Sequence, residues 1–236
     1  MSSHLTCLYY TAQRIDPRFG DAVRAELLRS TNNYYPIICV SHGPLAFGDV
    51  QIDVGPIAPS IYQVYVNVLL AAKAADTEHV CCCEDDTVYA KEHFYHRPAP
   101  DVFSYDRSRW VLTRRLSDDG KSRVALYYWR LRTQLAMLIA RRSLLVETLE
   151  ERLSAYPSFV PDDVAKKTGW GEPGRYEKNL RLTPRTRAYF EAGEPSITVN
   201  HTASLMGRRQ VQPTDLTCDD LPPWGKADRL WRRIHG

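Results

Sequence analysis

Apolar runs and helical spacing alternate along the first part of the chain. The continuous apolar runs at 5–12 and 35–42 are typical of strands that are buried on both faces. Between them, apolar residues in 16–31 recur at helical spacing, which predicts an amphipathic helix. The order strand, helix, strand predicts two parallel strands joined by a right-handed crossover.

The alternation continues through a loop and a second helix. Glycine and proline punctuate 43–60, which indicates a loop with room for one short strand. Ser60 is a suitable N-cap, and apolar side chains follow it at helical spacing up to about Ala72. The run EHVCCC at 78–83 predicts the next strand. Alternating strands and helices predict an α/β fold.

Strands dominate the next predicted elements. We expect strands in DVFSYD at 101–106 and in RWVLTRRL at 109–116. A turn signal at Asp119-Gly120 precedes a further strand. One more strand is expected in PSITVNHTASLMG, ending near His201.

The remaining segments predict one long helix and a tail. Apolar residues at helical spacing predict the longest helix from about Arg130 to Leu153. The polar region 157–195 carries glycine and proline throughout and indicates loops with some helix. We expect a single domain over 1–212 and a C-terminal tail, 213–236, packed on that domain.

Composition places the chain among ordinary globular proteins. It has 236 residues, of which 44% are apolar and 25% are charged. No apolar run approaches the roughly 18 residues of a membrane span. The N-terminus lacks the basic region and the apolar stretch of a signal peptide. We therefore expect a cytoplasmic protein, in the host cytoplasm if it is viral, with no membrane partner.

The six cysteines are expected to be reduced packing residues. None forms a C-x-x-C pair, and most lie in apolar, strand-like runs. The three consecutive residues Cys81, Cys82 and Cys83 would point alternately to opposite faces of a strand. They could not converge on one metal ion.

Three acids follow directly after the cysteine strand. Glu84, Asp85 and Asp86 stand where a buried strand leaves the sheet, which is the edge where open α/β sheets bind ligands. Mutual repulsion and desolvation both cost free energy there. A divalent cation such as Mg²⁺ or Mn²⁺, which takes oxygen ligands, would offset that cost. The alternative is a solvated acidic turn.

The acids and three other segments together resemble one enzyme family. EDD after a central strand, CLYYTAQR, IICVSH and the late ITVNHTASLMGRR stand in the order found in GT-A-type glycosyltransferases. The resemblance covers about 4–210 and implies a Rossmann-like, mostly parallel sheet flanked by helices. It also implies transfer of a sugar from a UDP-sugar donor with Mn²⁺ or Mg²⁺ as cofactor.

The resemblance assigns roles to individual residues. It implies that Asp86 and His201 ligate the metal and that Glu84 reaches the metal through water, or contacts the ribose. It implies donor contacts from residues near the first and last strands: Thr11, Arg14, Asp85, Arg208 and Arg209. For His201 the alternative is a histidine without a ligand, and for the two late arginines it is a basic surface pair.

The segment KKTGWGEPGRYEKN is a candidate for the acceptor side. Glu172 lies among three glycines beside Trp170 and is our candidate for the base of an inverting reaction. A glycine-rich surface loop is the alternative, and Asp162 and Asp163 are a second choice of base. Aromatic and basic residues are candidates for acceptor contacts: Trp129, Arg130, Trp170 and Arg142.

The acceptor itself is suggested by a narrower resemblance. EPG followed by a strand ending in histidine and by basic residues resembles small phage TET-associated glycosyltransferases, which modify 5-hydroxymethylpyrimidines in DNA. This implies double-stranded DNA containing 5-hydroxymethylcytosine as acceptor. The net charge of +3 is mild, but basic residues gather beside aromatic ones. Six arginines would then follow the DNA phosphates: Arg107, Arg109, Arg114, Arg115, Arg130 and Arg132.

Other functions remain open from the sequence. One alternative is a glycosyltransferase for a surface glycan or a small-molecule acceptor. Another is a non-catalytic module that binds nucleotide sugars or nucleic acid. A nucleotidyltransferase is less favoured, because TAQRIDPRFGD lacks a glycine-rich phosphate loop. The sugar, inversion or retention, and the oligomeric state stay open.

Overall fold

The computed structural model describes residues 4–117, 119–158, 171–175, 177–205 and 210–236. Its largest unit is a seven-stranded sheet in the order β10-β6-β9-β4-β1-β2-β3, and every neighbouring pair is parallel except those that involve β9. The strands are β1 (Leu5–Thr11), β2 (Ile37–Ser41), β3 (Val50–Asp53), β4 (His79–Glu84), β6 (Val102–Asp106), β9 (Leu138–Arg141) and β10 (Thr186–Phe190). The expected α/β fold with a mostly parallel sheet is confirmed.

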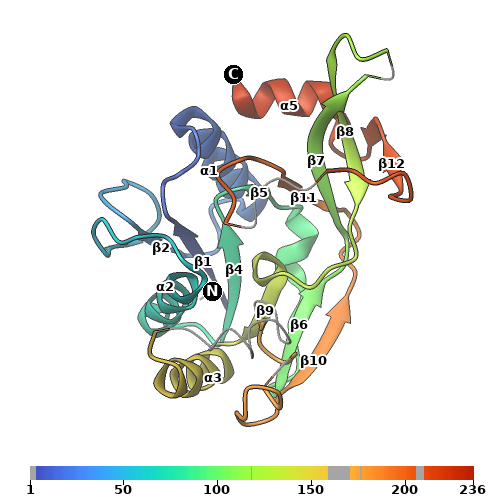
Figure 1. Ribbon diagram of the computed structural model, residues 1–236. Coiled ribbons are helices and arrows are strands. Elements are labelled where there is room, and N and C mark those ends of the chain that lie inside the picture. The colour runs from blue at the N-terminus through green and yellow to red at the C-terminus, as the bar shows by residue number, and fades with distance from the viewer. Residues whose placement is uncertain (1–3, 118, 159–170, 176, 206–209) are drawn as a thin grey trace.

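Helices cover both faces of this sheet. Helices α2 (Ile61–Ala74) and α3 (Arg142–Ala155) pack side by side on one face, and α1 (Pro17–Thr31) lies on the other (Figure 1). The predicted cap is confirmed, because the Ser60 hydroxyl accepts a hydrogen bond from the Gln63 N–H at 3.0 Å. Helix α1 begins the same way, with Asp16 accepting from the Arg18 N–H at 2.9 Å.

Alternation along the central strands divides the core into two layers. Leu8 and Tyr10 of β1 face the cluster under α2 and α3, whereas Cys7 and Tyr9 face the cluster under α1. Strand β4 is divided in the same manner, with Cys82 on the first face. All six cysteines are free thiols, and the five in β1, β2 and β4 are buried, whereas Cys218 is partly exposed. The sequence prediction of reduced packing cysteines agrees with this arrangement.

A second, five-stranded sheet stands beside the carboxyl ends of the large one. Its order is β12-β8-β7-β11-β5, built from β5 (Thr87–Val88), β7 (Arg109–Leu116), β8 (Arg123–Trp129), β11 (Ser196–Val199) and β12 (Thr217–Cys218). Strands β7 and β8 form a hairpin around the expected turn, and its tip extends away from the body (Figure 1). Two short 3₁₀ turns, η1 (Lys91–Tyr95) and η2 (Leu135–Met137), complete the connections.

The predicted helix from Arg130 to Leu153 is wrong in its first half. Residues 135–141 form η2 and β9, and α3 begins only at Arg142. Strand β9 fills the gap between β4 and β6 and is antiparallel to both, so its apolar side chains are buried on two faces. This tertiary pairing outweighs the helical spacing of the leucines. The region 157–195 also contains an edge strand, β10, which the sequence did not predict.

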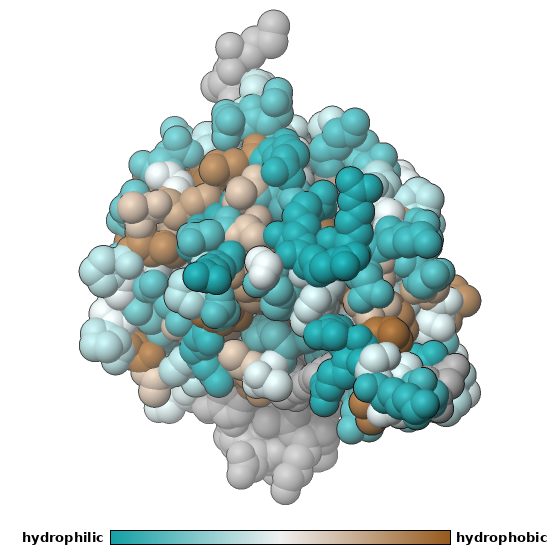
Figure 2. All heavy atoms as spheres, turned by 90° about the horizontal axis from the view of Figure 1, so that it is seen from above, coloured by the Kyte–Doolittle hydropathy of each residue, from teal (hydrophilic) through white to brown (hydrophobic). Residues whose placement is uncertain are grey.

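The C-terminal segment packs against the second sheet and against helix α1. Strand β12 pairs with β8, and a small ribbon of β13 (Asp220–Leu221) and β14 (Gly225–Lys226) leads into α5 (Ala227–His235). Helix α5 packs on α1 and β8, burying Leu230 and Ile234 against Phe19 and Val23. In the view from above, hydrophilic side chains cover much of the molecular face on which α5 lies (Figure 2). The boundary expected near residue 212 stays a prediction.

None of the helices in the described ranges is both long and apolar enough to span a bilayer.

A buried chain of three side chains joins β4 to β6. His93 Nδ1 lies 2.8 Å from Asp106 Oδ2, and His93 Nε2 lies 3.3 Å from Cys81 Sγ. Burial disfavours a charge on His93, but the neighbouring Cys81 and Asp106 outweigh burial and raise the pKa of His93 to about 9. Since Cys81 and His93 have no exposed surface, their thiol and imidazole have no access to a substrate.

Replacing Asp106 with alanine should lower the free energy of unfolding by about 3–5 kcal/mol, because the protonated His93 would then be buried without its carboxylate. Urea unfolding at pH 7 measures the change. The exposed Asp101 is the matched control, and Asp101→Ala should shift stability by less than about 0.5 kcal/mol. Equal and small effects of the two variants would contradict a buried ion pair at Asp106.

Candidate functional site

The main cleft opens at the carboxyl ends of the parallel strands. It has a volume of about 240 Å³, and its walls come from the ends of β1, β2 and β4, the start of α2, and the second sheet. The residues predicted for the donor side lie here together: Thr11, Arg14, Glu84, Asp85, Asp86 and His201. The expectation that a ligand cleft forms at this edge is therefore met by the fold itself.

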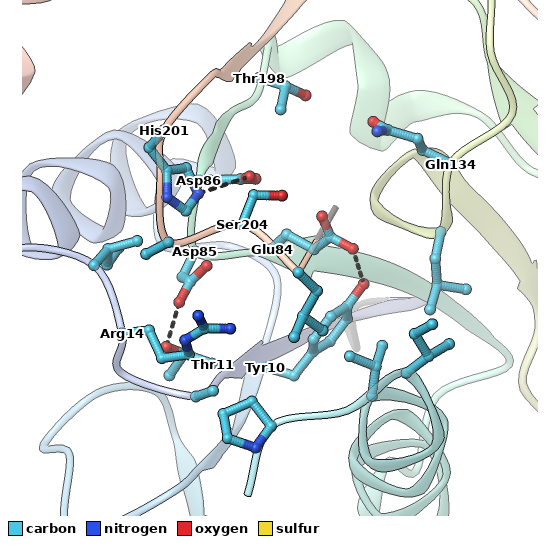
Figure 3. Close-up of a pocket in the computed structure, with 18 of the residues that line it drawn as sticks. Tyr10, Thr11, Arg14, Glu84, Asp85, Asp86, Gln134, Thr198, His201 and Ser204 are labelled. Carbon is cyan, nitrogen blue, oxygen red and sulfur yellow. Dashed lines mark hydrogen bonds and ion pairs between the residues drawn. The ribbon is translucent and has the colours of Figure 1, made fainter. Parts of the chain in front are cut away.

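Hydroxyl groups from β1 hold two of the three acids. Tyr10 donates its hydroxyl hydrogen to Glu84 Oε1 at 2.7 Å, and the Thr11 hydroxyl donates to Asp85 Oδ2 (Figure 3). The pairing of β1 with β4 fixes these contacts, because Tyr10 stands opposite Glu84 in the parallel register. The first strand therefore orients the carboxylates that the neighbouring strand presents.

The third acid, Asp86, is joined to the late histidine. His201 Nε2 lies 3.3 Å from Asp86 Oδ2, although the two residues are 115 positions apart in the sequence. Strand β11 brings them together, because it pairs antiparallel with β5 and the Val199 N–H donates to the Asp86 carbonyl at 2.8 Å. The other ring nitrogen of His201, Nδ1, is buried and has no hydrogen-bond partner among the described residues.

Burial and mutual repulsion raise the pKa values of the acids. Burial, followed by the charges of Asp86 and Asp85, raises the pKa of Glu84 to about 8. Burial and Asp86 raise the pKa of Asp85 to about 6. Burial lowers the proton affinity of His201, but its contact with Asp86 outweighs burial and raises the pKa of His201. The cluster is therefore short of positive charge at neutral pH.

The residues fit a divalent cation that is bound mainly by substrate. Within the described ranges, no three His, Cys, Asp or Glu side chains converge closely enough to form an ion site by themselves. Asp86 and His201 form a pair that could supply two ligands on one side of an ion. Mg²⁺ and related cations commonly bind through one or two carboxylates and take their other oxygens from phosphate and water. Imidazole as a ligand favours Mn²⁺ over Mg²⁺.

Polar groups next to β1 and β2 line the donor side of the cleft. Figure 3 shows Arg14 beside Thr11, on the same side as Asp85. His42 follows β2, and its Nδ1 lies 2.9 Å from the Ile57 carbonyl, while Nε2 accepts from Asn67 at 3.0 Å. The Ile57 contact requires a hydrogen on Nδ1, so the ring is held in one tautomer. His42 and Asn67 were not identified from the sequence.

Glu172, the base candidate, lines the cleft from a separate segment. It is 6% exposed and lies 3.6 Å from Arg175. The segment is held against the sheet because Tyr105 donates its hydroxyl hydrogen to the Pro173 carbonyl at 2.7 Å. Gly174 has a φ of +80°, and a Cβ there would lie 3.1 Å from the Thr186 carbonyl oxygen, so only glycine fits this approach.

The predicted acceptor residues are separated by the fold. Arg130 lines the cleft, but Trp129 is not among the residues that line it and is 38% exposed. Arg142 begins α3 next to Glu78, at the opposite end of β4 from the acids, so its assignment to the acceptor is wrong. Five predicted or alternative site positions lie outside the described residues: Trp170, Asp162, Asp163, Arg208 and Arg209.

Arg109 is the main correction to the sequence analysis. It was expected to follow DNA phosphates on the surface, but it is 1% exposed and lines the inner wall of the cleft. It donates to the Thr198 hydroxyl at 3.5 Å and to the Arg130 carbonyl at 3.2 Å. Burial and the positive charge of Arg130 lower the pKa of Arg109 to about 10. No sequence signal distinguishes it from the other arginines of this hairpin.

Comparisons with known proteins find structural matches at low sequence identity. No protein-family model and no curated protein sequence matches the chain. Three solved structures illustrate the structural matches. Glycosyltransferase GlyE of Streptococcus pneumoniae TIGR4 is 10% identical, with 80% of this chain and 45% of that chain covered and a TM-score of 0.43. A glycosyltransferase involved in glycosylation of the major capsid of PBCV-1 is 7% identical, with coverages of 83% and 92% and a TM-score of 0.43.

The third structure belongs to another class of enzyme. The 2-C-methyl-D-erythritol 4-phosphate cytidylyltransferase of Thermus thermophilus is 11% identical, with coverages of 90% and 94% and a TM-score of 0.40. At these identities and TM-scores the likenesses carry no argument about what this chain does.

Replacing Glu84 with glutamine should stabilise the metal-free protein at pH 8. The folded chain keeps a proton on Glu84 that the unfolded chain releases, so the free energy of unfolding falls as pH rises from about 4.3 to about 8. Glutamine removes that loss and still accepts from Tyr10. We expect a gain of roughly 1–2 kcal/mol, reduced from the full pKa shift because the carboxyl is partly hydrated.

Urea unfolding in the presence of EDTA at pH 8 and pH 4 measures this effect. The two proteins should converge at pH 4, where both states of the parent are protonated at this position. Glu191→Gln, at an exposed glutamate, is the matched control and should show no pH-dependent difference. Equal destabilisation of Glu84→Gln at both pH values would contradict repulsion within the cluster.

Proposed function

We propose that the chain is a metal-dependent glycosyltransferase that moves a sugar from a UDP-sugar to a hydroxyl group of an acceptor. One observation carries the proposal. Three acids and His201 meet in a cleft at the carboxyl edge of a mostly parallel sheet, beside the polar end of β1. Such a cluster suits a cation bound together with a diphosphate. The GT-A resemblance of the sequence assigns the same residues to this role.

The residues would divide the donor between them. Asp86 and His201 would hold the cation, which supplies positive charge to the diphosphate leaving group. Glu84 and Asp85, fixed by Tyr10 and Thr11, would orient water and the ribose next to it. The nucleoside would lie against the loops after β1 and β2, where Arg14 and Asn67 line the cleft. His42, whose ring nitrogens are engaged by Ile57 and Asn67, would hold Asn67 in place.

Glu172 is proposed as the base for an inverting reaction. The acceptor hydroxyl oxygen would attack the anomeric carbon while the bond from that carbon to the diphosphate breaks. Glu172 would accept the hydroxyl proton on a carboxylate oxygen, and its contact with Arg175 would orient the carboxylate. Its position on the cleft wall supports this role.

Modified DNA is the proposed acceptor. A 5-hydroxymethyl group offers a primary hydroxyl, and an enzyme reaches it either in the major groove or after base flipping. Arg115 and Arg123 are exposed near the turn of the β7–β8 hairpin, whose opposite end lines the cleft through Arg109, Val111 and Tyr128. These positions could contact phosphates and would make binding sensitive to salt.

Release of UDP should require the metal and Asp86. Incubation with a panel of UDP-sugars and Mn²⁺ is expected to release UDP, and EDTA should abolish the release. Asp86→Asn should lower the rate at least about 100-fold, because the leaving group loses its compensating charge. The exposed Asp101→Asn is the matched control and should retain the parent rate.

The acceptor is tested in the same assay. DNA that contains 5-hydroxymethylcytosine should stimulate UDP release, whereas unmodified DNA should not. Stimulation by a glycan or a small sugar alone would keep the transferase and replace the acceptor. A folded protein that binds UDP but releases none from any donor would contradict the proposed activity and favour a binding module.

Glu172→Gln should lower kcat by about 100- to 10,000-fold while the Kd for UDP and Mn²⁺ stays unchanged, because only the proton acceptor is lost. Single-turnover transfer together with calorimetric titration of UDP separates the two effects. Unchanged kcat would exclude Glu172 as the base. A parallel rise in the Kd for UDP would assign it a structural role in the cleft.

A further inference from the structure

A second pocket adjoins the cleft and is lined by an unusual number of arginines. It has a volume of about 240 Å³ and lies beyond the carboxyl ends of β6 and β10. Three of its arginines, Arg109, Arg130 and Arg132, line the main cleft as well, so the two cavities are neighbours. Six arginines line the pocket in all: Arg107, Arg109, Arg130, Arg132, Arg175 and Arg187.

The fold gathers these arginines from segments that are far apart in the sequence. Strand β10 pairs in parallel with β6, with Arg187 opposite Phe103, and Arg107 directly follows the end of β6. The Tyr189 ring lies between them, 4.8 Å from the Arg107 guanidinium carbon and 5.0 Å from that of Arg187. The Tyr189 hydroxyl is 3.1 Å from the Thr133 hydroxyl, which fixes the ring. Two guanidinium groups are thus held in place by one aromatic side chain.

The pocket has an excess of positive charge. Asp106 is the single carboxylate among the described residues that line it, and both of its oxygens are engaged. Oδ1 accepts from the Ser108 N–H at 2.8 Å and from the Ala192 N–H at 3.2 Å, and Oδ2 contacts His93. Since His93 and Asp106 form an ion pair, they add no net negative charge to balance the arginines.

The positive charge of Arg109 has no carboxylate partner within the described part of the protein. It is almost fully buried, its donor contacts there are to a hydroxyl and a carbonyl, and its Nε has no hydrogen-bond partner. A buried cation without a carboxylate partner costs free energy, which a bound anion would offset. The wall that separates the two cavities therefore contains a buried guanidinium group that, among the described residues, has no carboxylate in direct contact.

We propose that this arginine pocket binds a phosphate group of the acceptor. Guanidinium groups match phosphate oxygens through paired hydrogen bonds, and several at one site suit a doubly charged or bridging phosphate. Because the pocket shares three arginines with the cleft, a phosphate held there would place the rest of its molecule at the sugar-transfer site. Assigning the phosphate to the acceptor rests on the proposed function, whereas anion binding by the pocket does not depend on it.

The phosphate could belong to a nucleic-acid backbone or to a small phosphorylated molecule, and two ligands distinguish these sources. A fluorescein-labelled double-stranded oligonucleotide and a hexose 6-phosphate are titrated without UDP-sugar or metal, by fluorescence anisotropy and calorimetry respectively. Binding of at least one ligand is expected. Arg187→Gln and Arg132→Gln should each weaken it at least about tenfold. Arg187→Lys, which keeps the charge but loses the fork, should fall between parent and glutamine variant.

Arg229→Gln, at an exposed arginine on α5, is the matched control and should bind like the parent. Circular dichroism and thermal melting establish that each variant is folded. Binding of the oligonucleotide that depends on the pocket arginines assigns a backbone phosphate, and the same dependence for the hexose phosphate alone assigns a small acceptor. Binding by neither ligand, or equal binding by parent and pocket variants, would overturn the proposal. Failure of UDP release would leave this result unchanged, so the two proposals fail separately.

Discussion

Repulsion among three carboxylates at the end of β4 is the constraint on which the site depends. Glu84, Asp85 and Asp86 are crowded into a partly buried cleft, where each charge raises the cost of the next. The fold contains the cost with neutral donors from β1 and with His201 from β11. The hydroxyl contacts orient Glu84 and Asp85 without adding positive charge. An arrangement that is unfavourable for the empty protein is what a site for a cation and a diphosphate requires.

The opposite wall of the cleft carries buried positive charge. Within the described ranges Arg109 is buried there without a carboxylate partner, and further arginines converge behind it. The cleft therefore separates an acidic edge from a basic wall across a short distance, with Glu172 and Arg175 joined at one side. This polarity would orient a donor whose diphosphate is drawn to the acidic edge with its cation and an acceptor whose phosphate is drawn to the basic wall. The acidic edge and the basic wall thus suggest one orientation for donor and acceptor in the cleft.

Local sequence patterns predicted the elements that carry the acids. The runs that became β1, β2 and β4 are buried on both faces, and such strands leave a clear apolar signal. Their carboxyl ends then locate the acids without any knowledge of distant contacts. His201 could be placed only through the GT-A resemblance, because its approach to Asp86 depends on the pairing of β5 with β11.

Features that depend on distant pairing could not be predicted from local sequence patterns. Strand β9 has helical spacing and becomes a strand only because β4 and β6 leave a gap for it. Arg109 and Arg115 occupy one strand and look alike in sequence, yet one is buried in the cleft and the other is exposed.

The central claim is that Asp86 and His201 hold a cation together with a nucleoside diphosphate. The most direct measurement is a crystal structure with UDP and Mn²⁺, using anomalous diffraction to locate the manganese. We expect one anomalous peak within coordination distance of Asp86 Oδ2 and His201 Nε2, with the diphosphate completing the ion's ligands. A structure in which UDP occupies the cleft without manganese near these two side chains, or in which manganese binds elsewhere, would contradict the account.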